Sequence, residues 1–345
     1  MPKEVFIASG IVFGIVFGFL LKRSRFCAAG LTRDILLENR WYNAVYIPAI
    51  VMMEAFIYFL MVGSDVIPGP KMADFSLFRI GLGSLMFGVG AVLCNGCIVS
   101  SLLKCGDGRL IGWISVPIFT LSAYTAKGGW LALTTKSLDK VWSVPDTLLA
   151  NLPISPIVLA GVGMIIMLWA LRYVYNTTKL GFTIPGRYTG WRHIVFEKIW
   201  PKEMVVMLIG IWMALGFLFS NWAGRNGGFG ITTPLVSWFE FFTAGKSLGW
   251  ASLFVLGIII GAFITAWLGG EFSIVKPRLQ SIVLTVIGSV LMGIGAVWAS
   301  GCFIGNVMVG TAQFSMKAWY STIFIVSGVW LATFIMIKMR TFTRN

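Results

Sequence analysis

Five cysteines carry most of the chemistry available to this chain, and two of them stand in matching surroundings. Cys97 ends the segment GSLMFGVGAVLCNGC, and Cys302 ends the segment GSVLMGIGAVWASGC. The two segments lie 205 residues apart and are identical at 8 of 15 positions. Because a thiol is a weak, polarizable donor, it suits transient contact with a soft anion. Cys97 and Cys302 are therefore binding candidates, with burial as small apolar side chains as the alternative.

The segments after these cysteines are apolar but too short to cross a membrane. They are residues 98–103 and 303–310, and a comparable segment follows Cys27 beside the basic residue Arg25. Such pieces are typical of broken or re-entrant helices, whose first backbone N–H groups and positive dipole end favour anions. We expect all three thiols to lie at helix starts.

Other uses of the thiols are less well supported. Cys94 and Cys97 have the spacing of a dithiol redox motif, but no thioredoxin-like context surrounds them and Ala299 aligns with Cys94. One histidine and scattered thiols do not form a zinc pattern, so no metal or cofactor is expected. We interpret Cys94 and Cys105 as buried apolar residues.

Glu54 lies inside an apolar run, where an ionisable group is a functional candidate by default. It would serve as a proton relay or as the partner of a buried arginine. The alternative is a carboxylate that snorkels or is hydrogen-bonded within its helix.

The elements that position these residues must lie in a membrane. The chain has 345 residues, of which 57% are hydrophobic and only 12% are charged, with a mean hydropathy of +0.86. So much apolar surface needs lipid around it, and the continuous apolar runs predict helices rather than a β-barrel. The net charge of +14 is typical of basic loops in a membrane protein and does not imply nucleic acid.

Nine apolar stretches are long enough to span the membrane. They are residues 5–21, 42–62, 78–93, 110–126, 153–171, 204–220, 248–269, 279–298 and 318–337. The first run has no small-residue cleavage site after it, so we expect a membrane span rather than a signal peptide.

The basic residues predict the orientation. With nine spans and a cytoplasmic C-terminus, 18 of the 27 Lys and Arg residues fall on the inner side, which the positive-inside rule favours. The longest inner loop, 172–203, holds six of them and the only histidine, His193. It divides the chain into an N-terminal half, 1–171, and a C-terminal half, 204–345.

The duplicated cysteine segments indicate an internal repeat. A second match pairs Gly18-Phe-Leu with Gly216-Phe-Leu, so each half has the same order of elements. With nine spans the third and eighth run in opposite directions, which predicts the inverted repeat found in many transporters. A single additional or missing span would make the repeat parallel.

Taken together, these motifs resemble the YeeE/YedE family of sulfur-transport membrane proteins, and more closely its YeeE-like thiosulfate-uptake branch. The similarity covers essentially the whole chain. It is carried by Arg23-Ser-Arg-Phe-Cys27, Gly96-Cys97, Gly301-Cys302-Phe-Ile-Gly-Asn306, Gly190-Trp-Arg-His-Ile-Val-Phe-Glu-Lys198 and Gly228-Phe-Gly-Ile-Thr-Thr-Pro234. The chain departs from the pattern at Cys94 and Asn95, where relatives tend to have small residues.

The resemblance implies an hourglass-shaped, all-α bacterial inner-membrane protein with nine spanning helices and several re-entrant helices. It implies a transporter, not an enzyme, in which cysteine thiols hand thiosulfate inward by S–H contacts. The implied substrate path consists of Cys27, Cys97, Cys302, Gly96, Gly301, Asn306 and Arg25. On the predicted topology Cys302 lies nearest the outer mouth. A TusA-like cytoplasmic sulfur carrier is the implied partner, besides membrane lipid.

Three other functions stay open on the sequence. The first is transport of selenium or of another reduced sulfur species, because selenium-linked proteins also resemble this family. The second is a membrane thiol oxidoreductase that uses Cys94 and Cys97, although no quinone or flavin motif accompanies them. The third is a structural scaffold, against which the repeated cysteines argue.

Overall fold

The protein is mostly helical, and its long helices coincide with the apolar runs of the sequence. The computed structural model describes residues 3–70, 72–146, 154–178, 190, 193–225 and 227–342. Each of the nine predicted spans coincides with a long helix. These are α1 (Lys3–Ser24), α3 (Tyr46–Gly63), α4 (Leu77–Leu93), α6 (Leu110–Lys127), α8 (Pro156–Thr178), α9 (Lys202–Trp222), α11 (Trp250–Leu268), α12 (Leu279–Trp298) and α13 (Met316–Phe342).

Eight helical segments among the described residues are long and apolar enough to cross a membrane. The helix α6 is not one of them, because its serines, threonines and Lys127 make it less apolar than the others. The all-helical membrane fold is thus confirmed, while the ninth crossing stays a prediction.

Short helices follow each of the three candidate cysteines, as expected. They are α2 (Ala28–Leu37), α5 (Ile98–Gly106) and the π-helical η3 (Ile304–Gly310). The remaining elements are the 3₁₀ turn η1 (Trp41–Val45), α7 (Ala132–Asp139), the π-helical η2 (His193–Glu197), α10 (Thr232–Ala244), and the antiparallel strands β1 (Phe75–Ser76) and β2 (Ser143–Val144).

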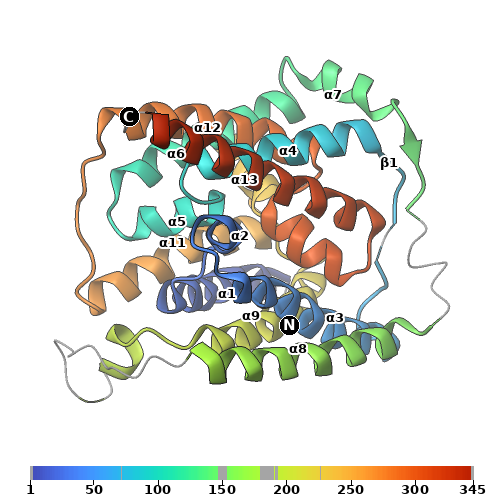
Figure 1. Cartoon of the computed structure of the whole chain (residues 1–345). Coiled ribbons are helices and arrows are strands. Elements are labelled where there is room, and N and C mark those ends of the chain that lie inside the picture. Colours follow the sequence, from blue (N-terminus) through green and yellow to red (C-terminus); the bar gives the residue numbers. More distant parts are fainter. Residues whose placement is uncertain are drawn as a thin grey trace.

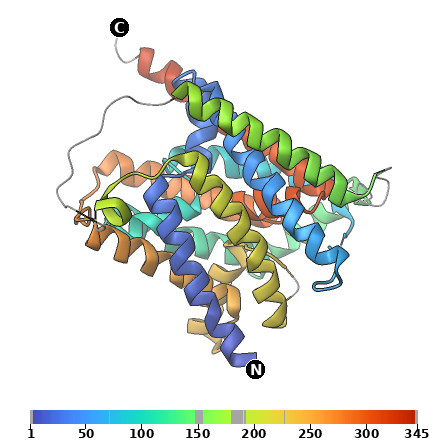
Figure 2. The same cartoon turned by 90° about the horizontal axis from the view of Figure 1, so that it is seen from below.

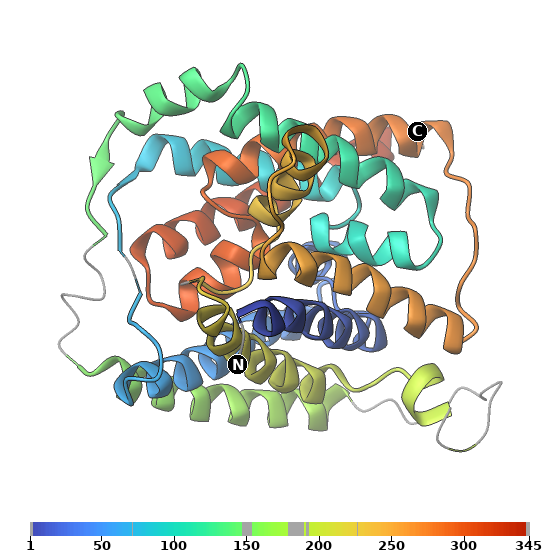
Figure 3. The ribbon, with the colours of Figure 1, turned by 180° about the vertical axis from the view of Figure 1, so that it is seen from behind.

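The helices form two groups with the short helices between them. Figure 1 shows α4, α12 and α13 on one side, α1, α3, α8 and α9 on the other, and α2 and α5 in the middle. Figure 3 shows α6 and α11 from behind. Packing crosses between the predicted halves: α1 packs on α11 and α9 on α3, while α4 packs on α13 and α12 on α6. Two repeats with one order of elements would pack in this reciprocal way. The inverted relation, the hourglass shape and the divisions at 171 and 204 stay predictions.

The helix α1 packs closely against α11, and glycines make the approach possible. A Cβ atom added at Gly14 would lie 2.7 Å from the Cα atom of Gly257, and one added at Gly261 would lie 2.2 Å from the carbonyl oxygen of Ile15. Small residues at four-residue spacing allow such backbone contact in membranes. This packing holds the end of α1, and with it Cys27, against the second half of the chain.

The helix α8 lies at the periphery, beside α3, as Figure 2 shows. Most of its large apolar side chains are exposed, which suits contact with lipid. It continues through Thr178, so the linker predicted from residue 172 begins inside this helix. The predicted inner-loop residues Lys179, Arg187 and Arg192 lie outside the described residues, and the orientation stays a prediction.

Candidate functional site

Cys97 lies at the start of α5 because the chain reverses sharply after α4. Asn95 and Gly96 both have positive φ, at 51° and 137°, and Cys97 then takes an extended conformation as the N-cap of α5. A Cβ atom on Gly96 would lie only 2.8 Å from the Cβ atom of Ser100. Glycine is therefore required here by both φ and space. The N-cap residue Cys97 makes no side-chain capping hydrogen bond, and the positive end of α5 beside it favours an anion.

Cys302 follows a turn with the same backbone hydrogen bonds. Gly96 N donates to the Ala91 carbonyl at 2.8 Å, and Gly301 N donates to the Ala296 carbonyl at 2.9 Å. The buried Asn306 fixes the second turn, since its Nδ2 donates to the carbonyl oxygens of Ala299 and Gly301 at 2.9 and 3.0 Å. Asn306 thus positions the Cys302 backbone.

Cys27 is the N-cap of α2, and its sulfur is held by two neighbours. Its Sγ accepts from Gly30 N at 3.3 Å and lies 3.0 Å from Ser100 Oγ. The residue before Phe26, Arg25, has a φ of 49° and ends α1 in a left-handed conformation. The starts of α2 and α5 are therefore joined through Cys27 and Ser100.

A small cavity lies beside two of the three thiols, those of Cys27 and Cys97. Its volume is about 20 Å³, and Cys27, Cys97 and Ser100 line it together with apolar side chains that include Phe17 and Phe303. Such a volume holds about one water molecule. Cys97 and Cys302 are only 3% and 1% exposed and belong to the core cluster against which Cys27 packs. The region around these thiols is therefore closely packed.

A basic vestibule reaches the other side of Cys27. This cavity of about 470 Å³ is lined by the cationic residues Lys22, Arg25, Lys104 and Arg109, and Cys27 and Ser100 also line it. Asp107 and Glu271 oppose part of the charge, and Lys22 Nζ lies 2.7 Å from Asp107 and 3.0 Å from Glu271. Arg25 lies 3.8 Å from Glu271. Four cations against two carboxylates leave this vestibule positive, which attracts anions.

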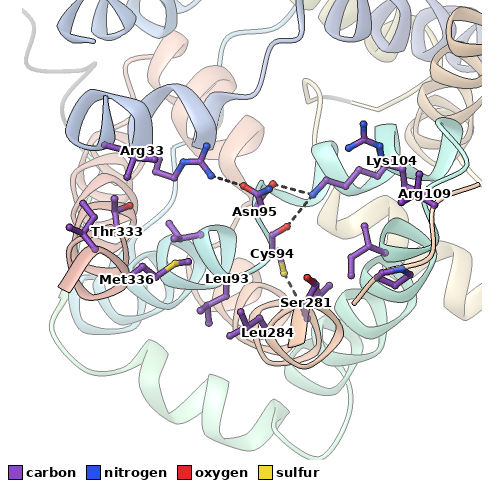
Figure 4. A pocket seen from close by; sticks show the side chains of 17 residues that line it. Arg33, Leu93, Cys94, Asn95, Lys104, Arg109, Ser281, Leu284, Thr333 and Met336 are labelled. Carbon is purple, nitrogen blue, oxygen red and sulfur yellow. Dashed lines mark hydrogen bonds between the residues drawn. The ribbon is translucent and has the colours of Figure 1, made fainter. Parts of the chain in front are cut away.

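Lys104 lines the vestibule and also contacts the C-terminal end of α4. Its Nζ donates to the carbonyl oxygens of Cys94 and Asn95 at 3.1 and 3.0 Å, as Figure 4 shows. A cation at the negative end of a helix dipole is favourable. The same contacts hold the turn that leads to Cys97.

Comparison with known proteins identifies the family of this chain. The family described as Sulphur transport matches residues 23–331. This chain belongs to that family. It is 31% identical over 334 residues to the thiosulfate transporter TsuA of Escherichia coli (strain K12), which covers 95% of this chain and 94% of that protein.

Two further relatives differ in how much of this chain they match. The thiosulfate transporter TsuA of Spirochaeta thermophila is 29% identical over 350 residues, which is 96% of this chain and 99% of that protein. The probable transporter YedE of Escherichia coli is 32% identical over only 79 residues, or 23% of this chain and 20% of that protein. As a member of the sulphur transport family with apolar, helix-length spans, this chain is a multi-pass membrane protein.

Other residues that the sequence singled out do not line the small cavity. Glu54 on α3 is fully buried, and neither carboxylate oxygen has a hydrogen-bond partner among the described residues. The structure therefore gives it no snorkelling route, no arginine partner and no internal hydrogen bond within that part of the chain. Cys105 is buried on α5, as expected.

The thiol of Cys94 contacts α12 rather than Cys97. Its Sγ lies 3.4 Å from the Thr285 carbonyl oxygen and 3.5 Å from Ser289 Oγ. Both cysteines are free. The dithiol hypothesis gains no support from this arrangement, and Cys94 is buried as the sequence predicts.

Ser100 and Lys104 are site residues that the sequence reasoning missed. Their spacing from Cys97, at three and seven residues, puts all three on one face of α5, so helical periodicity alone pointed to them. Arg225 was also missed. It follows α9, and its Nη1 is buried without a hydrogen-bond partner in the described part of the chain, where burial lowers the pKa of the guanidinium. No sequence motif distinguishes Arg225 from other loop arginines.

Proposed function

We propose that this protein takes up thiosulfate across a bacterial inner membrane, past the thiols of Cys302, Cys97 and Cys27. The observation that carries the proposal is the small cavity lined by Cys27 and Cys97, because Cys27 also lines the basic vestibule and Phe303, the neighbour of the buried Cys302, lines the same cavity. The two thiosulfate transporters that match over nearly the whole chain support the choice of anion.

The chemistry of the path suits weak, successive contacts. Each thiol donates its S–H to the anion, and the N-terminal N–H groups of α5 and η3 add positive potential beside it. Because a thiol has no formal charge, it binds the anion weakly enough to release it, which conduction requires. A cavity that holds about one water must widen for each passage, so Phe17 and Phe303 move aside when the anion passes.

The proposed order of the thiols rests on the predicted topology and on the cavities that Cys27 and Cys97 line. Cys302 is the first thiol from the outer mouth, Cys97 is the second, and Cys27 delivers the anion to the vestibule. Arg25 and the other vestibule cations draw it onward. Arg225 lies in a loop that the predicted topology places outside, where a buried Nη1 without a hydrogen-bond partner among the described residues favours an arriving anion.

Two further roles belong to this proposal. Glu54 serves as a proton relay. A buried carboxylate without a hydrogen-bond partner among the described residues is unfavourable, so this group takes up a proton and can release it again during transport. A TusA-like carrier docks on the basic inner side and accepts sulfur there. With the predicted cytoplasmic C-terminus, Lys198 and the vestibule lie on that side.

The alternatives are less well supported. None of the relatives reported above is named for selenium, whereas the two thiosulfate transporters match almost end to end. An oxidoreductase would need Cys94 to face Cys97, and the Cys94 thiol contacts α12 instead.

The test is uptake of radiolabelled thiosulfate by bacteria without their own sulfate and thiosulfate importers, with and without a co-expressed TusA-like carrier. We expect the parent to take up the label, and Cys27→Ala, Cys97→Ala and Cys302→Ala to lose most uptake at matched membrane levels. Cys105→Ala is the matched control, since this buried cysteine does not line the cavity. Full uptake by Cys97→Ala or Cys302→Ala would refute the cysteine path. Failure of the parent with the carrier would point to another substrate.

A further inference from the structure

A second basic cavity opens beside the end of α4, separate from the thiols of the proposed path. We call this cavity the inner groove. It has a volume of about 440 Å³ and lies among the ends of α4 and α13, the first half of α12 and the loop before α12, as Figure 4 shows. Its cationic residues are Arg33, Lys104 and Arg109.

The charge of the inner groove is not balanced. No acidic residue is found among the described residues that line it. Lys104 donates only to neutral carbonyl oxygens, and Arg33 donates to Asn95 Oδ1 at 2.5 Å as well as pairing with Asp34 at 3.0 Å. Arg109 has no side-chain hydrogen bond or ion pair within the described part of the chain. The three cations that line the groove therefore give it a positive potential, which attracts anions.

The rest of the inner groove is apolar. Leu37, Val92, Leu284 and Met336 are among the side chains that line it, and they belong to α2, α4, α12 and α13. An inorganic anion would satisfy the cationic end but leave this wall in contact with water. A molecule with an anionic headgroup and hydrocarbon chains can pair with the cations and also cover the apolar wall.

The position of the groove favours a lipid over other amphiphiles. The helices α4, α12 and α13 that form its walls belong to segments apolar enough to cross a membrane. The cations of the groove lie on α2 (Arg33), on α5 (Lys104) and just before α6 (Arg109), and the predicted orientation places all three on the cytoplasmic side, where anionic lipids attract cations. We propose that the inner groove binds an anionic phospholipid, with its phosphate at Arg109, Lys104 and Arg33 and an acyl chain along Leu284 and Met336.

Native mass spectrometry of the full chain in detergent tests the proposal. Phosphatidylglycerol and phosphatidylcholine with identical acyl chains compete for the protein, and glycerol phosphate is the headgroup-only competitor. We expect preferential binding of phosphatidylglycerol that glycerol phosphate does not displace. Because one cation near a membrane surface contributes about 1 kcal/mol, Arg109→Gln should weaken phosphatidylglycerol binding about fivefold.

The matched control is Lys276→Gln, which removes the same charge from an exposed residue of the neighbouring loop that does not line the groove. Arg109→Lys should restore most of the binding because it keeps the charge. Equal binding of the two lipids, an equal effect of Arg109→Gln and Lys276→Gln, or displacement by glycerol phosphate would each overturn the proposal. The last result would make the groove a site for free anions.

Discussion

Ser100 is the side chain that faces the Cys27 thiol, and it shows how residues beyond the cysteines shape the proposed path. Its hydroxyl lies 3.0 Å from Cys27 Sγ and lines both the small cavity and the vestibule. The hydroxyl can accept from the thiol or donate to it. It therefore offers the passing anion a polar group at the point where the path narrows.

Ser100→Ala removes that hydroxyl and leaves the Gly30 N–H as the only hydrogen-bond partner of the Cys27 sulfur among the described residues. A net hydrogen bond contributes about 1 kcal/mol, so we expect labelled thiosulfate uptake to fall about fivefold without being lost. Ser64→Ala, at the end of α3, is the control, because its hydroxyl bonds only to carbonyls of its own helix. Unchanged uptake in Ser100→Ala would contradict a role in the path.

Glu54 is the other residue whose surroundings demand a functional test. Glu54→Gln keeps the shape of the side chain but cannot exchange a proton. We expect uptake to fall by about an order of magnitude or more at an unchanged level of folded protein, because a relay step is lost. Glu240→Gln changes a carboxylate that is paired with Lys246 at 3.0 Å, and it should leave uptake intact. Equal uptake by the two variants would reduce Glu54 to a structural role.

At the scale of elements, the turns before α5 and η3 decide where the thiols lie. Both turns reverse the chain through a residue with positive φ, Asn95 or Ser300, followed by glycine. In each case a long helix ends and a short helix begins within a few residues. The thiol is thereby placed at the positive end of the short helix.

Gly96→Ala tests this arrangement, because the new Cβ atom would meet Ser100 and a φ of 137° strains any side chain. We expect a loss of stability of about 1–3 kcal/mol, seen as a lower thermal unfolding midpoint, together with reduced uptake. The control is Gly128→Ala, since a Cβ atom there has nothing within 4 Å and φ is −138°. If both variants unfold at the same temperature as the parent, the turn does not depend on glycine.

For the whole molecule, the three thiols differ in how far they are open to solvent. Cys27 is half-buried and borders the basic vestibule, whereas Cys97 and Cys302 lie in the closed core. The vestibule opens on the side that the positive-inside rule assigns to the cytoplasm. Accessibility of single thiols therefore reports both the order of the path and the orientation of the chain.

Variants that keep one cysteine each should react differently with a membrane-impermeant maleimide. We expect Cys27 to be labelled in inside-out vesicles and not in intact spheroplasts, because the predicted orientation places the vestibule on the cytoplasmic side. Cys97 and Cys302 should stay unlabelled in both without substrate, like the buried control Cys105. Labelling of Cys27 from the outside would show that the orientation is reversed.

The sequence by itself determined the helical membrane class, the positions of the long helices and the short helices after Cys27, Cys97 and Cys302. These features depend on local hydropathy and on glycine turns, which neighbouring residues specify. It also indicated the family, whose match spans residues 23–331.

Only the tertiary structure decided which side chains meet. Ser100 reaches Cys27 across 73 positions of the chain, Cys94 contacts Ser289 across 195, and Glu54 is left without a partner among the described residues. The close approach of α1 to α11 likewise depends on glycines about 240 residues apart, such as Gly14 and Gly257. Hydropathy and periodicity act within one helix, whereas these contacts depend on how several helices pack, which no local pattern in one sequence encodes.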